Sequence, residues 1–191
     1  PGTYKPPLNG GSDRGYRGVV TVRECLAQCL NVPAVKVAQM VGAATVATVA
    51  KSCGVETKVP ASLPAVALGA GAQCTPMEIA VAYATIAAGG VYSKPHLITK
   101  VKDASGKLLY RNVGTRKNAV AKNAADKLSA CLRDGAEGAD LGADTAVRAG
   151  TAGTSDDSRD AWFVGYTKSL ACAVWCGRDD SVGLPGGGKE V

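Results

Sequence analysis

The 191-residue sequence has a single histidine, His96, and contains no G-x-S-x-G turn. A Ser-His-Asp triad would therefore have to use that histidine, which follows Pro95 at the entrance to a predicted strand. No serine or cysteine has a lysine three residues later, so the S-x-x-K arrangement of a nucleophile with its local base is also missing. The chain supplies no recognisable catalytic nucleophile, and we predict no catalytic residue within it.

Long apolar runs are scarce as well. The stretch "VGAATVATVA" at 41 to 50 is half of the roughly 20 residues that a membrane-spanning helix needs. The chain opens on "PGTYKPP", with no Met and no leader in which basic residues precede an apolar run. We therefore expect an interior piece or a processed product, and we expect any membrane anchor to lie outside this chain. With 46% apolar and 20% charged residues, the composition is that of a folded domain.

Seven cysteines are an odd number, which excludes a complete disulfide framework. The closest pairs have C-x-x-x-C spacing and only one histidine is available, so the sequence argues against a zinc site, and we predict no metal and no cofactor. Five cysteines lie among Ala, Val and Leu and are predicted to be small buried hydrophobic side chains: Cys53, Cys74, Cys131, Cys172 and Cys176.

The net charge of +6 is unevenly placed, because seven bases and the single acid Asp103 lie between residues 94 and 117. The bases are Lys94, Lys100, Lys102, Lys107, Arg111, Arg116 and Lys117. Such a patch favours an anionic partner such as nucleic acid or a wall polymer. Only Tyr92 and Tyr110 lie near it as stacking platforms, which disfavours nucleic acid. A solvated hairpin surface is the interpretation that we prefer from the sequence.

Two capping boxes, "TVRE" at 21 to 24 and "TPME" at 75 to 78, predict helix starts. The first helix runs toward Cys29 and is interrupted at Pro33, which places Asn31 at a joint between two helices. The other predicted helices span 33 to 40, 43 to 53, 76 to 88 and 119 to 133. Two charged segments around "ASG", at 96 to 103 and 107 to 112, predict a hairpin.

Two unbroken apolar runs, 161 to 164 and 170 to 175, predict central antiparallel strands with both faces covered by helices. Residues 148 to 155 are predicted as a third strand beside them. The expected fold class is α+β, with an antiparallel sheet packed between helices.

Three segments carry a resemblance to a known family. "ECLAQCLNVPAVKVA" at 24 to 38 resembles the S-x-N segment of class A penicillin-binding proteins, and "RAGTAGTSDDSRDAWFVGYT" at 148 to 167 is similar to their A-G-K-T-G-T strand and its continuation. "TPMEIAVAYATIAAGG" at 75 to 90 resembles a connecting segment of the same proteins. The resemblance covers nearly the whole chain and implies a beta-lactamase/transpeptidase-like fold.

The resemblance also implies where the family's site would lie. In the family, the strand lysine and the hydroxyl that follows it help to bind the substrate carboxylate, and these positions are Thr151 and Ala152 here. The motif's Gly153 and Thr154 are kept, which implies close strand approach at Gly153 and an oxyanion and carboxylate donor at Thr154. These positions form the strand half of the implied site.

The loop half of the implied site has one substitution and one match. Cys29 occupies the S-x-N serine position, whereas Asn31 is kept as a hydrogen-bond partner. Arg148 is a poor replacement for the lost lysine, because a residue three positions before Thr151 starts on the opposite face of a strand. Nucleophilic attack by Cys29 itself is a further hypothesis, but no base is evident beside it in the sequence.

By this resemblance, residues 1–191 are a partial transpeptidase domain whose nucleophile helix and first strands precede it and whose closing helix follows it. We expect an uncovered sheet face and marginal stability in isolation. The implied parent cross-links peptidoglycan by acyl transfer from D-Ala-D-Ala stem peptides, binds beta-lactams and acts at the extracytoplasmic face of the bacterial membrane. The alternative is a non-catalytic relative that binds peptidoglycan or a partner protein.

Overall fold

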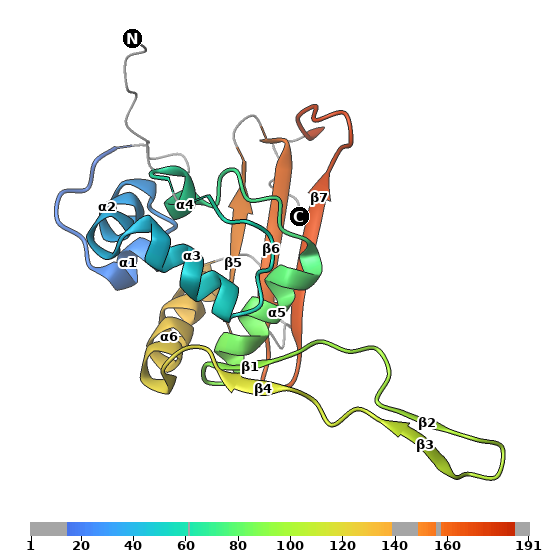
Figure 1. Ribbon diagram of the computed structural model, residues 1–191. Helices are drawn as coiled ribbons and strands as arrows, with labels where there is room; N and C mark the ends of the chain where they lie inside the picture. Colours follow the sequence, from blue (N-terminus) through green and yellow to red (C-terminus); the bar gives the residue numbers. More distant parts are fainter. Residues whose placement is uncertain (1–14, 61, 139–148, 156–157, 186–191) are drawn as a thin grey trace.

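A computed structural model describes residues 15–60, 62–138, 149–155 and 158–185 (Figure 1). The helices are α1 (Val22–Ala27), α2 (Asn31–Val41), α3 (Ala43–Ser52), α4 (Ala65–Leu68), α5 (Pro76–Ala87) and α6 (Lys122–Gly138). The strands are β1 (Val91–Ser93), β2 (Lys100–Lys102), β3 (Leu108–Arg111), β4 (Arg116–Asn118), β5 (Ala149–Thr154), β6 (Asp160–Tyr166) and β7 (Ala171–Gly177). They form a three-stranded sheet in the order β5-β6-β7 and two separate ladders, β1-β4 and β2-β3.

Both predicted capping boxes are present and start α1 and α5. The Thr21 hydroxyl accepts from the Glu24 N–H at 3.2 Å, and the Glu24 carboxylate accepts from the Thr21 N–H at 2.7 Å. Thr75 and Glu78 repeat the exchange at 3.2 and 2.8 Å, with Pro76 at the start of the helix. These reciprocal bonds satisfy amide donors that would otherwise lack partners in the first turn.

The three predicted strands are confirmed as an antiparallel sheet, although Arg148, where the first was predicted to begin, lies outside the described residues. The register places Thr151 opposite Val164, and Val164 opposite Ala173. The core under this sheet joins Leu132 of α6 to Ala149 and Tyr166. The predicted mixture of helices and antiparallel sheet is therefore confirmed.

In the described part of the chain, α5 and α6 pack against the same face of the sheet, the one that carries Ala149, Tyr166 and Ala171. On the opposite face Cys172 and Val174 are exposed, so among the described residues helices cover one face and not the two predicted for the central strands. This agrees with the expectation of an uncovered face. The prediction that Cys172 is buried is wrong, because side chains alternate along β7 and this one points to the open face.

The other cysteines predicted to be buried lie in more enclosed positions. Cys53 is buried, whereas Cys74, Cys131 and Cys176 are half-buried.

Helix α6 begins later and ends later than predicted. Its start is delayed because the amides of Ala119 and Val120 both donate to the Gly90 carbonyl, at 2.9 and 3.1 Å. Gly135, predicted to end the helix, lies within it instead. A Cβ at Gly135 would lie 3.5 Å from the Ala27 carbonyl oxygen and 3.5 Å from that of Gly150, so the glycine serves close packing and not helix termination.

The predicted hairpin is confirmed as β2 and β3, with Lys100 opposite Arg111 and Val101 opposite Tyr110. It projects from the body as an arm beyond the β1-β4 ladder (Figure 1). That ladder was not predicted, since its three-residue strands carry no clear apolar alternation.

Among the described residues, no single helix is long and apolar enough to cross a membrane. Helices α2 and α3 reach that length and composition only together, and they are bent by 92° at the break between them.

Glu78 provides a test of the fold, since its carboxylate accepts hydrogen bonds from three amides. Besides Thr75, it accepts from the N–H groups of Glu56 and Thr57 at 2.9 and 2.7 Å, which ties the chain after α3 to the start of α5. The backbone hydrogen bond from Thr75, together with those from Thr57, lowers the pKa of the Glu78 carboxyl to about 2.

We expect Glu78→Gln to lower the free energy of unfolding by about 1–2 kcal/mol at pH 7, as measured by chemical denaturation. Because the folded pKa is lower than the unfolded value of about 4.3, the carboxylate stabilises the fold above pH ~5, and that stability is lost as the pH falls toward 2. The difference between wild type and variant should therefore shrink over that window. Glu56→Gln, which removes the same charge next to the site, is the control, and an equal loss there would contradict the assignment.

Candidate active site

Helix α1 ends in a backbone motif that presents Cys29. The Leu30 N–H donates to the Cys25 carbonyl at 2.9 Å and the Cys29 N–H donates to Leu26 at 3.4 Å, which is the paired pattern of a Schellman ending. Cys29 is the left-handed residue of this motif, with φ 50°. Glycine is the usual residue there, so a side-chain-bearing residue in this conformation suggests that its side chain has a use.

The structure brings Cys29 into contact with Thr151 of β5. Their Sγ and Oγ1 atoms are 3.5 Å apart, although the residues are 122 positions apart in sequence. The remaining contacts of these two groups in the described residues are with the carbonyl oxygens of Leu26 and Ala152. Two residues that were predicted to occupy motif positions therefore face each other through a contact between a thiol and a hydroxyl.

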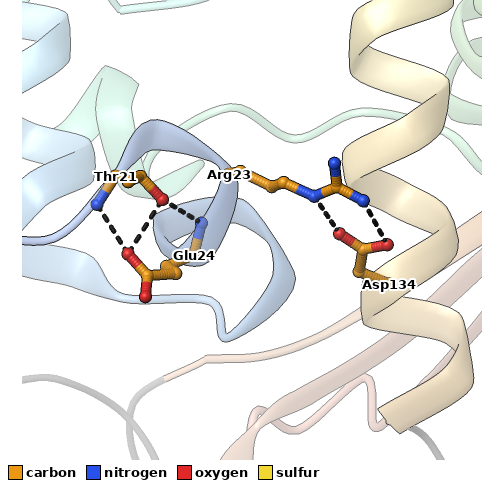
Figure 2. A network of polar contacts seen from close by, with 4 residues as sticks. All are labelled: Thr21, Arg23, Glu24 and Asp134. Carbon is orange, nitrogen blue, oxygen red and sulfur yellow. Dashed lines mark hydrogen bonds and ion pairs between the residues drawn. The ribbon is translucent and has the colours of Figure 1, made fainter.

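Helix α6 sets the distance between the two halves of this contact. Gly135 lies between Ala27, the last residue of α1, and Gly150 of β5. One residue earlier, the Arg23 guanidinium donates to both carboxylate oxygens of Asp134, with Nη2 to Oδ1 at 2.9 Å (Figure 2). The hydrogen bond from Arg23 also holds the pKa of the Asp134 carboxyl below its ordinary value.

These α6 residues and Arg23 were missed by sequence reasoning. The one available signal was the isolated glycine inside a helical pattern, which favours a packing role as much as a helix end. In Figure 2 the ion pair and the Thr21–Glu24 capping box lie at the same end of α1, so both fix the start of the helix that leads to Cys29. The pair is exposed, and we assign it an orienting role more than a stabilising one.

The other predicted site residues lie close to this contact along the chain. Asn31 is the first residue of α2, half-buried and two positions after Cys29. Thr154 is exposed at the end of β5. A Cβ at Gly153 would meet no described atom within 4 Å, so no close approach of another strand is present there among the described residues. The predicted role of Gly153 therefore applies to a bound substrate and stays a prediction.

Two tyrosines stand behind the Cys29–Thr151 contact. The ring of Tyr83 on α5 lies 6.5 Å from that of Tyr166, whose hydroxyl donates to Ser129 at 2.8 Å. Burial, with smaller contributions from Cys29 and Tyr166, raises the pKa of Tyr83 to about 12. Tyr83 therefore keeps its phenolic proton at physiological pH and packs as a neutral ring against Tyr166.

Strand β5 is an edge strand within the described sheet, which leaves one side of its backbone unpaired there. An extended peptide can add to such an edge through main-chain hydrogen bonds, with its alternate side chains facing the protein. The edge begins at the buried Ala149 and Gly150, passes Cys29 at Thr151 and ends at the exposed Gly153 and Thr154. The arrangement therefore suits an extended peptide that runs along β5.

No group of three His, Cys, Asp or Glu side chains that could hold a metal ion occurs in the described parts of the chain.

A family model described as "Penicillin binding protein transpeptidase domain" matches residues 5–176. The chain belongs to this penicillin-binding transpeptidase family. The predicted family resemblance is thus confirmed, whereas the assignment of individual motif positions stays a prediction. The Cys29–Thr151 contact joins the two segments for which the S-x-N and A-G-K-T-G-T motifs were predicted.

Curated relatives agree with this membership. The chain is 30% identical over 185 residues to penicillin-binding protein 1A of Clostridium acetobutylicum, covering 94% of this chain and 23% of that protein. It is 33% identical over 174 residues to penicillin-binding protein 1B of Vibrio cholerae, covering 88% of this chain and 22% of that protein. The chain thus spans less than a quarter of the length of these relatives.

Solved structures show the same fold. Penicillin-binding protein 1A of Haemophilus influenzae superposes with a TM-score of 0.81 at 24% identity, covering 96% of this chain and 34% of that one. The PonA1 protein of Mycobacterium tuberculosis, solved in complex with penicillin V, gives a TM-score of 0.74 at 28% identity, covering 90% of this chain and 51% of that one. These matches confirm the transpeptidase-like architecture, and some members of the family bind beta-lactams.

The geometry of the contact can be tested by cross-linking. With Sγ and Oγ1 3.5 Å apart, Thr151→Cys should place a second thiol within bonding reach of Cys29 after a small side-chain movement. We expect mild oxidation to join the two, as detected by mass spectrometry of proteolytic peptides. Ala152→Cys is the matched control, because its side chain points to the other face of β5 and should leave Cys29 free. Equal cross-linking of both variants would contradict the register.

Gly135 can be tested by graded enlargement. A Cβ there makes ordinary contacts at 3.5 Å, so Gly135→Ala should change the free energy of unfolding by less than about 1 kcal/mol. Gly135→Leu must push α1 away from β5, and should cost about 1–3 kcal/mol and slow the cross-link in the Thr151→Cys background. Ala124→Leu, at an exposed position of α6, serves as control. An unchanged cross-linking rate in Gly135→Leu would show that α6 does not set the spacing.

Proposed function

We propose that this chain forms part of a penicillin-binding D,D-transpeptidase that cross-links peptidoglycan by acyl transfer from D-Ala-D-Ala stem peptides. In this proposal the chain supplies one wall of the substrate cleft, with Cys29 and Asn31 on the loop side and Thr151 to Thr154 on the strand side. The observation that supports it is the 3.5 Å contact between Cys29 and Thr151, which joins two family motif segments.

Each residue has a role that follows from its position. The Thr154 amide and hydroxyl, at the exposed end of β5, donate to the developing oxyanion and to the substrate carboxylate. Asn31 is a hydrogen-bond partner of the substrate peptide, and open space at Gly153 lets the peptide approach β5. The attacking serine comes from a nucleophile helix outside this chain, since residues 1–191 are taken as a partial domain.

The substitutions weaken carboxylate binding. With Thr151 at the lysine position and Ala152 at the hydroxyl position, a charge-assisted hydrogen bond of about 1.5–3 kcal/mol is lost. That loss corresponds to about one to two decades in affinity. The proposed activity is thus low, and the isolated chain is inactive. The parent protein is placed at the extracytoplasmic face of the bacterial membrane, where stem peptides and beta-lactams are accessible.

Fluorescent penicillin tests the proposal on the complete protein that contains this chain. We expect covalent labelling that survives denaturation, and a labelling rate raised about 10–100-fold by Thr151→Lys, which restores the charge. Thr151→Met, which introduces a side chain of similar length without the charge, is the matched control and should not raise the rate.

One result of the same experiments would contradict the enzymatic proposal. Retention on peptidoglycan without any penicillin labelling, in both the wild type and Thr151→Lys, would overturn the enzymatic proposal. That result would indicate a non-catalytic relative of the same fold.

A further inference from the structure

The arm formed by residues 94 to 117 carries charge that the fold does not use. It contains seven bases and one acid, and it extends from the body beyond β1 and β4, on the side away from α1 (Figure 1). The acid, Asp103, accepts from the Ser105 and Lys107 amides, both at 2.9 Å, and shapes the turn at the tip. The Asp103 carboxylate binds the amides of the turn, and it is the single acid among these residues, so the arm keeps a large excess of positive charge.

The bases are also placed against one another. Lys100 lies directly opposite Arg111 in the β2-β3 ladder, and like charges in directly opposed positions destabilise a hairpin. At the base of the arm, the Lys117 ammonium lies 4.9 Å from the centre of the Tyr92 ring and makes no ion pair within the described residues. Neither Lys100 nor Arg111 forms an ion pair with a described residue, so this pair of like charges favours an anionic ligand.

A hollow of about 420 Å³ lies where the arm joins the body. Its lining includes the basic side chains of Lys94, His96 and Arg116. It also includes the hydroxyl groups of Ser93 and Thr115 and the side-chain amide of Asn112. Neither Lys94 nor Arg116 forms an ion pair with any described residue. The hollow therefore combines unneutralised positive charge with donors and acceptors suited to a polar, carboxylate-bearing ligand.

We propose that the arm and its hollow bind an anionic wall polymer, namely a peptidoglycan strand whose stem peptides carry free carboxylates. The carboxylates pair with Lys94 and Arg116, and the hydroxyls and the amide bond the peptide and sugar groups. Tyr110, half exposed on the arm, offers a face for a sugar ring. The choice of a wall polymer as the anion rests on the proposed function.

A membrane surface fits the arm less well. Leu97 and Val113, of which Val113 lines the hollow, are 94% and 93% exposed, but the tip of the arm is the polar turn "DASGK". A segment that inserts into a bilayer interface would place apolar side chains at its leading edge. Nucleic acid is disfavoured by the small number of aromatic platforms.

Co-sedimentation of the full chain with insoluble peptidoglycan tests the proposal. We expect Lys94→Gln with Arg116→Gln to weaken binding roughly tenfold, and amidation of the peptidoglycan carboxylates to weaken binding of the wild type to a similar extent. Lys51→Gln with Lys127→Gln removes the same charge from exposed positions on α3 and α6 and should leave binding unchanged. A second arm variant, Lys100→Gln with Lys102→Gln, should weaken binding as well, and circular dichroism confirms that each variant is folded.

Several outcomes would overturn the proposal. They are the absence of binding, equal losses in the arm and control variants, insensitivity to amidation, and tighter binding to anionic lipid vesicles or to DNA than to peptidoglycan. Penicillin labelling of the complete protein is measured separately. Labelling without peptidoglycan binding refutes only the arm site, whereas binding without labelling refutes only the enzymatic proposal.

Discussion

The candidate site depends on one close-packing constraint, the passage of α6 between the end of α1 and strand β5. Gly135 lies at this passage, with the carbonyl oxygens of Ala27 and Gly150 both 3.5 Å from where its Cβ would be. The Schellman ending of α1 then directs Cys29 toward the strand, and the register of β5 presents Thr151 to it. Backbone packing, and not the chemistry of the two side chains, therefore sets the geometry of the contact.

This separation of geometry from chemistry explains how the motif positions can change while the architecture persists. In the proposed assignment, the Cys29 thiol stands at a hydroxyl position and the Thr151 hydroxyl at an ammonium position, and the two side chains still approach to 3.5 Å. On this proposal the substitutions change the affinity for a carboxylate while the fold is kept. A close structural match to penicillin-binding proteins is therefore compatible with a weakened site, and the match alone does not measure activity.

Features with local causes were predictable from the sequence, whereas those that depend on packing were not. The capping boxes at Thr21 and Thr75 are decided within four residues, and the central strands by short apolar runs, so both were found. The Cys29–Thr151 contact spans 122 residues and was reachable only through family resemblance. Gly135 was misjudged as a helix end and Cys172 as buried, because sequence alone does not reveal what packs beside a helix or which sheet face is left open.

The distribution of charge connects the two proposals. The cleft wall has no described positive charge at Thr151, whereas the arm concentrates seven bases in 24 residues. Tethering a ligand at one site raises its effective concentration at a second site on the same molecule to the millimolar range, provided that the linker spans both. A peptidoglycan strand is a repeating polymer, so a strand held by the arm presents further stem peptides to β5. Retention of the strand would in this way offset a loss of one to two decades in direct carboxylate affinity.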